Sequence, residues 1–136
     1  MSRLLLPDLK SLLLSALLLF TTYAQADPGL IAAEQVTGTW ISSEQTPGQG
    51  QVDTLMTIKV DGSFSGSLLV NNETVWTFSG NWTLDKNAIN WEYTESSLVL
   101  LVEDRSEVDT VLSLGQDEMT LKSGRRDGVR TLRRVQ

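Results

Sequence analysis

Apolar and polar residues alternate along most of the chain after residue 36, and this period of two constrains the fold more than any other feature. In the clearest stretch, from Val52 to Val60, every second residue is apolar or Thr. Turn-forming Gly, Asp and Asn residues separate such stretches, and apolar residues nowhere keep a helical period for three turns. The pattern therefore predicts an all-β domain built from short strands.

The first hairpin joins the stretch 52–60 to the stretch 64–70. If Val60 shares the inner face with Phe64, three residues must lie between them, namely Asp61, Gly62 and Ser63. Gly62 suits the left-handed conformation that such a loop needs. We therefore predict a three-residue turn over 61–63, with Val60 facing the core.

Aromatic residues line one face of the next strands. Trp76, Phe78 and Trp82 share one parity with Gly80, and Ile89, Trp91 and Tyr93 continue the inward set after a turn at 85–87. Gly80 interrupts the aromatic row, which favours a bend or a bulge at that position.

The remaining strands are shorter. The inward parity of the strand at 108–114 is predicted to belong to Val108, Thr110, Leu112 and Leu114. Counting further strands at 36–43, 119–122, 129–135 and at Leu98–Val102, the chain holds about eight or nine. Since no connection is long enough for a crossover helix, we expect an antiparallel up-and-down meander that closes into a barrel.

The first residues have the pattern of a cleavable signal peptide. Arg3 and Lys10 flank a short aliphatic run over 12–20, and Ala24-Gln25-Ala26 gives the small-x-small cleavage pattern. We interpret 1–26 as the signal peptide, 27–35 as a linker and 36–136 as the barrel domain. The alternative of a membrane anchor is disfavoured because the run is shorter than the roughly 20 residues of a spanning helix. The expected product is exported, either periplasmic or secreted, and does not span the membrane.

Several short motifs resemble those of the lipocalins, in particular small bacterial lipocalin-like domains with a calycin-type barrel. Gly38-Thr39-Trp40 is similar to the Gly-x-Trp motif that opens lipocalins, and the segments 61–64, 80–85 and 111–135 resemble the central and closing strands of those domains. The resemblance implies that Trp40 packs against an Arg of the last strand. We choose Arg134, which shares parity with Leu132, and keep Arg133 as the alternative if the register slips by one residue.

The resemblance also implies a function. Such a barrel binds a small apolar or aromatic ligand in its mouth, and the rings that would line this site are Trp76, Phe78, Trp82, Trp91 and Tyr93. The alternative is that these rings fill the core, which leaves an accessory or inhibitor-like barrel of the cell envelope that binds other proteins.

Two further segments are candidates for contact with partners. The run Leu98–Val102 is apolar without alternation, which is typical of a strand buried on both faces, but it would also suit a partner-binding or dimer edge. The segment 122–136 holds six basic residues against one acidic residue. Either its charges pair with acidic strands, or Arg125, Arg126 and Arg130 form an anion-binding or partner-binding patch.

Composition excludes much other chemistry. The chain has no His and no Cys, so imidazole bases, thiolate nucleophiles, disulfides and Cys/His zinc sites are absent. We expect a protein that is not an enzyme and that uses neither a cofactor nor a metal. Nucleic acid is disfavoured because the formal charge is −6 and the basic residues are not interleaved with aromatic ones.

Overall fold

A computed structural model describes residues 30–136; the expected signal peptide and the start of the linker lie outside this range. The last residues of the expected linker are part of a short helix, α2 (Ala33–Val36), and the first strand begins two residues later at Gly38. Among the residues described, no helix has the length and apolar character needed to cross a membrane.

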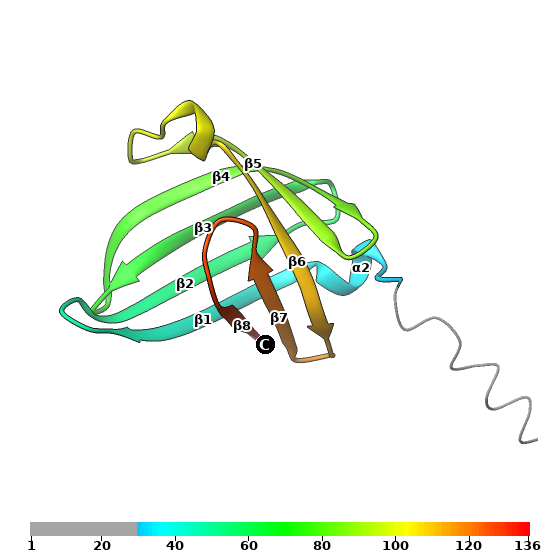
Figure 1. The fold of residues 1–136 in the computed structure, drawn as a ribbon, viewed down its shortest axis with the longest axis horizontal. Helices are drawn as coiled ribbons and strands as arrows, with labels where there is room; N and C mark the ends of the chain where they lie inside the picture. The colour runs from blue at the N-terminus through cyan, green and yellow to red at the C-terminus, as the bar shows by residue number, and fades with distance from the viewer. Residues whose placement is uncertain (1–29) are drawn as a thin grey trace, which may run out of the picture. The chain divides into compact units, whose positions relative to one another are not determined.

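Eight antiparallel strands form a closed barrel in chain order, as Figure 1 shows. Their bounds are β1 (Gly38–Thr46), β2 (Gly50–Ile58), β3 (Ser63–Val70), β4 (Glu73–Asp85), β5 (Ala88–Ser96), β6 (Ser106–Leu114), β7 (Glu118–Ser123) and β8 (Val129–Arg134). The all-β, up-and-down meander predicted from the alternation is therefore confirmed.

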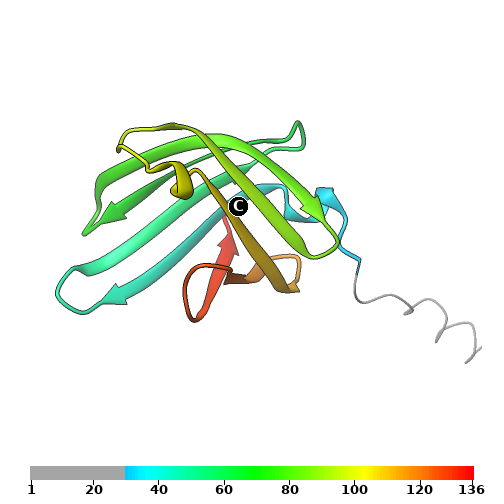
Figure 2. The ribbon, with the colours of Figure 1, turned by 45° about the horizontal axis from the view of Figure 1, so that its top comes forward.

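The two ends of the barrel differ. In Figures 1 and 2, α2 lies at one end, and the β1–β2, β3–β4 and β5–β6 loops lie at the opposite end, which we call the mouth. The core contains Val36, Trp40, Ile89, Met119 and Leu132, which are almost completely buried. The α2 end is thus filled by apolar side chains, so any binding site within the barrel must be sought toward the mouth.

The barrel closes where β8 meets β1. Trp40 is paired with Arg134 across these strands, and the Arg134 guanidinium carbon lies 4.1 Å from the centroid of the Trp40 ring. Arg133, the alternative partner, is opposite Ile41 instead. Gly38, at φ +131°, has no side chain to obstruct this guanidinium, since a Cβ there would overlap Arg134 Nη1.

Hydrogen bonds fix both partners of the stacked pair. Trp40 Nε1 donates to the carbonyl oxygen of Val36 over 2.9 Å, and Arg134 donates to the carbonyl oxygens of Thr37, Gln35 and Gln116. One guanidinium therefore ties β8 to the chain that enters β1 and to the β6–β7 turn. This network is the seam of the barrel.

Gly80 lies opposite a β-bulge in β5, where Thr94 is the extra residue. The pairing of β4 with β5 shifts between Ser79 and Gly80, and a Cβ on Gly80 would overlap the carbonyl oxygen of Glu92. The irregularity expected at this position is therefore present, because the two strands approach too closely for a side chain.

Two sequence-based assignments of facing residues were wrong. Val60 does not face the core but is 74% exposed, because Ile58 pairs with Phe64 and the loop is Val60-Asp61-Gly62, one residue earlier than predicted. In β6 the inner face carries Asp109 and Val111, whereas Val108 and Leu112 are exposed. The alternation of β6 was misread because a charged residue occupies an inner position, and a register shift after Val111 returns Leu114 to the inner face.

The apolar run Leu98–Val102 is not a strand. It forms the loop between β5 and β6 and leads into a short 3-10 turn, η1 (Val102–Asp104). Most of its side chains are exposed, with Val99 at 99%. The predicted strand buried on both faces is therefore absent, and the run instead places aliphatic side chains in solvent beside the mouth.

Candidate functional site

The five rings proposed to bind ligand divide into two groups by depth. Phe78, Trp82 and Trp91 are buried, whereas Trp76 and Tyr93 are only half-buried. Trp82 donates its indole N–H to the carbonyl oxygen of Lys59 over 2.8 Å, on the α2 side of the barrel. Trp82 is consequently part of the core, and Trp76 and Tyr93 are the rings that a ligand can reach.

Trp76 and Tyr93 belong to one continuous group of aromatic side chains. Their centroids lie 5.7 Å apart, and Trp76 packs on Phe78 at 4.5 Å. Tyr93 meets Phe64 edge-on at 5.5 Å, and Phe64 meets Trp91 in the same way at 5.0 Å. These edge-to-face arrangements are favourable and fix the ring planes, so the accessible rings are held by the buried ones.

A pocket of about 320 Å³ opens beside Tyr93. It lies between the end of β5 and the loop that follows, and its lining includes Ser96, Leu98, Leu100 and Arg105. Ser96 also accepts the indole N–H of Trp76 over 2.8 Å. The apolar loop and the aromatic group therefore border the same pocket, which is large enough for a small ligand.

Charged and polar side chains occupy the inner face of the strands next to Tyr93. Glu107 and Asp109 come from β6, Ser123 from β7 and Arg130 from β8. Ser123 Oγ donates to Glu107 Oε1 over 3.0 Å. Burial, together with the negative charge of Glu107, raises the pKa of Tyr93 to about 12, so the phenol stays protonated at neutral pH.

Asp109 is the most buried member of this polar group, with 1% of its surface exposed. Its Oδ2 atom accepts hydrogen bonds from Trp91 Nε1 at 2.9 Å and from Arg130 Nη2 at 3.1 Å. Burial raises the pKa of Asp109, and Glu107 acts in the same direction, while Arg130 lowers it. The alternation of β6 concealed this residue; the signal available in the sequence was only an Asp between Val108 and Thr110 in a strand of alternating residues.

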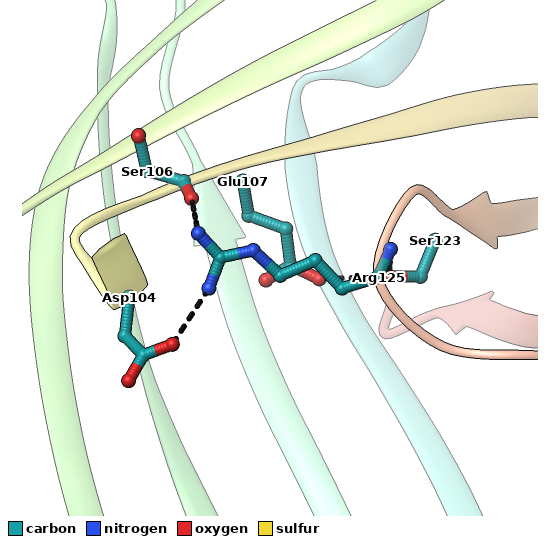
Figure 3. Close-up of polar contacts among 5 residues, drawn as sticks. All are labelled: Asp104, Ser106, Glu107, Ser123 and Arg125. Carbon is teal, nitrogen blue, oxygen red and sulfur yellow. Dashed lines mark hydrogen bonds and ion pairs between the residues drawn. The ribbon is translucent and has the colours of Figure 1, made fainter. Parts of the chain in front are cut away.

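The three arginines of the proposed basic patch have different surroundings. Arg125 forms an ion pair with Asp104 at 2.8 Å and donates to the carbonyl oxygen of Ser106 at 2.6 Å, as Figure 3 shows. Arg130 pairs with Asp109 as described, and Arg126 lies in the exposed β7–β8 loop. Two of these charges thus already have acidic partners, which weakens the patch as an anion site.

The contacts of Arg125 join two loops at the mouth. Its backbone N–H donates to Ser123 Oγ, which in turn contacts Glu107, so the β7–β8 loop is tied to η1 and to the start of β6. The ion pair with Asp104 is about half exposed, with side-chain exposures of 40% and 46%. This latch keeps one side of the mouth in a defined position.

A second groove, of about 540 Å³, lies on the outer surface of β2, β3 and β4. Its lining is rich in hydroxyl groups, from Thr57, Ser65, Ser67, Thr77 and Ser79, and also includes Glu95 of β5. Most of these residues have the parity opposite to that of the core, but the lining also includes Phe78, which belongs to the aromatic group.

Comparison with known proteins adds no relative. No known family model matches the chain, and no curated protein matches its sequence. The closed, eight-stranded antiparallel barrel is consistent with a calycin-like fold.

Proposed function

We propose that this protein is an exported, non-catalytic binding module of lipocalin-like type that holds a small apolar or aromatic ligand at the barrel mouth. The observation that carries the proposal is the position of two half-buried rings that a buried aromatic group fixes. Tyr93 lines a pocket of about 320 Å³, and Trp76 lies 5.7 Å from Tyr93 and donates its indole N–H to Ser96, which lines the same pocket. Partly exposed aromatic rings around a pocket favour flat or apolar ligands.

Several features of the chain support this proposal. The first-strand Gly-x-Trp motif and the stacked pair of Trp40 and Arg134 agree with the lipocalin resemblance. The absence of His and Cys from the sequence leaves few groups for catalysis at neutral pH. Leu98 and Leu100 add aliphatic surface to the same pocket, which would increase the apolar area that a ligand buries.

A fluorescence titration tests the binding site. N-phenyl-1-naphthylamine, a neutral dye that brightens in apolar surroundings, should bind at micromolar concentration and quench tryptophan emission. Trp76→Leu should weaken binding about tenfold, equivalent to about 1.4 kcal/mol. Val75→Ala is the matched control, since Val75 is the outward neighbour on β4, and should bind as the wild type does. Absence of binding, or equal loss in both variants, would refute the site.

Export is tested separately. When the full chain is expressed in a bacterial host, we expect the processed protein in the periplasm or the medium, with Asp27 as its first residue. Intact mass measurement of each fraction decides the matter. An unprocessed chain that remains in the cytoplasm would contradict this part of the proposal without affecting the binding site.

A second candidate function is contact with another protein. The exposure of Val99 and Val102, at 99% and 75%, favours it, because aliphatic side chains gathered on one loop often mark an interaction surface. Mass spectrometry under non-denaturing conditions separates the two. A retained small molecule would support ligand binding, whereas a clean mass with a copurifying polypeptide would support the second candidate.

A further inference from the structure

The polar side of the barrel interior suggests which ligands the mouth prefers. This inference rests on the proposed function and specifies its ligand class. Tyr93 links the two sides: it packs on Phe64, Trp76 and Phe78, and the charges of Glu107 and Asp109 act on its hydroxyl group. The interior around Tyr93 is therefore amphipathic: aromatic rings from β3–β5 lie beside the charged side chains of Glu107, Asp109 and Arg130, although the rest of the inner face of β6–β8 is apolar.

Asp109 has an unused hydrogen-bond acceptor. While Oδ2 receives two donors, Oδ1 is buried and accepts no hydrogen bond from any residue that the structure describes. A buried polar atom without a partner is destabilising, and such atoms are rare in folded proteins. A ligand that brings a donor to Oδ1 would remove this cost.

The net charge of the side chains around Asp109 favours a positively charged hydrogen-bond donor on the ligand. Around Asp109, the two carboxylates of Glu107 and Asp109 face one guanidinium, that of Arg130. A single positive charge on the ligand would balance the excess, and the neighbouring aromatic rings also attract cations through their faces. A ligand carboxylate would instead meet two like charges.

Access to Asp109 depends on Arg130. The Arg130 side chain is 32% exposed and donates one hydrogen bond to Asp109, so a ligand that approaches Asp109 from solvent would have to displace this guanidinium. Trp91 is buried and holds Oδ2 from the other side. The carboxylate thus stays oriented when Arg130 shifts.

We propose that the mouth selects an amphipathic amine, a molecule with an aromatic or apolar body that packs on Trp76 and Tyr93 and an ammonium group that donates to Asp109 Oδ1. The aromatic side contributes affinity for the body, and Asp109 with Glu107 distinguishes the head group. Molecules with the same body and a neutral or anionic head bind more weakly.

Isothermal titration calorimetry of the full-length barrel with three probes tests this inference. The probes share one body and differ in the head group: 2-naphthylethylamine, 2-naphthylethanol and 2-naphthylacetate. At pH 7 we expect the amine to bind at least tenfold more tightly than the other two. Asp109→Asn should abolish this preference while leaving the affinity for the alcohol within about threefold. Asp117→Asn, the same change on an exposed turn, should preserve the preference.

Glu107→Gln provides a second variant in case Asp109→Asn does not fold, and it should reduce the preference for the amine by several-fold. Equal binding of the three probes, or tighter binding of the acetate, would overturn the amine inference and leave the proposed binding site intact. A preference that survives in both Asp109→Asn and Glu107→Gln would also overturn it. If no probe binds, the proposed function itself fails, and the inference fails with it.

Discussion

Replacement of Arg134 is the perturbation whose size can best be derived from the structure. Arg134→Ala removes the guanidinium that stacks on Trp40 and its hydrogen bonds to the carbonyl oxygens of Thr37, Gln35 and Gln116. The stacking contributes about 0.5–2 kcal/mol. Each hydrogen bond adds about 0.5–1 kcal/mol, at the lower end of the usual range because water competes at the rim. We therefore expect the free energy of unfolding to fall by about 2–5 kcal/mol.

The matched control is the neighbouring residue. Arg133→Ala removes the same charge from the exposed face of β8 and should change stability by less than about 0.5 kcal/mol. Urea unfolding followed by tryptophan fluorescence measures both variants, and the Arg134 variant should also lose about 10 °C or more in Tm. If both variants lose the same stability, or Arg134→Ala loses less than about 1 kcal/mol, the seam does not hold the barrel closed as described.

Three further predictions concern buried charge, backbone approach and loop tethering. Burial raises the pKa of Asp109 in the folded protein, so the contribution of this residue to stability is lost as pH rises. In urea titrations, the free energy of unfolding of the wild type relative to that of Asp109→Asn should decrease between pH 4 and pH 7. A constant or rising difference would contradict this. Gly80→Ala should lower the free energy of unfolding by about 3 kcal/mol or more, because its Cβ would overlap the carbonyl oxygen of Glu92 on β5. The control is Gly115→Ala, whose Cβ would meet only ordinary contacts and which should cost less than about 1 kcal/mol. Thermal unfolding measures both variants. Arg125→Ala should change global stability by less than about 1 kcal/mol, because its ion pair with Asp104 is exposed. It should nevertheless accelerate amide hydrogen exchange across residues 123–128. Unchanged exchange would show that Arg125 does not hold the β7–β8 loop in place.

The fold was predictable because its strongest determinants are local. The alternation from Val52 to Ile58 and the aromatic row on β4 each assign one face to the core. Both assignments are confirmed except at Asp53, which is buried although it belongs to the outward row. Short turns leave only antiparallel neighbours, so closure into a barrel follows. The position of Val60 was missed because a hairpin loop of three residues fits the same sequence at two neighbouring places, and pairing of Ile58 with Phe64 decides between them.

The charged residues on the inner face of β6 were not predictable from the alternation of apolar and polar residues. In β6 the apolar residues Val108 and Leu112 are outside and Asp109 is inside, the reverse of what hydrophobicity indicates. The inversion is possible because Trp91 and Arg130 supply hydrogen bonds to the carboxylate, from strands distant in sequence. Hydrogen bonds between strands cannot be read from a short stretch of sequence. The alternation alone therefore assigned the wrong face of β6 to the core.

The β5–β6 loop illustrates a second limit. An unbroken apolar run such as Leu98–Val102 is more often buried than exposed, and the sequence alone favoured a strand. In the structure β5 ends at Ser96, whose hydroxyl group binds its own loop through the backbone N–H and carbonyl oxygen of Leu98. This local turn ends the strand and directs the run into solvent.

Assignment of the mouth as the binding site is tested most directly by the indole N–H resonances of the four tryptophans, because each reports on a different part of the barrel. Trp76 is half-buried at the mouth, and Trp91 is buried but donates its indole N–H to Asp109. Trp40 and Trp82 are buried and donate theirs to the backbone carbonyl oxygens of Val36 and Lys59. On titration with N-phenyl-1-naphthylamine in ¹⁵N-labelled protein, we expect large shifts of the Trp76 and Trp91 signals and small ones for the other two. Shifts confined to Trp40 and Trp82, or no shift in any of the four, would contradict the account.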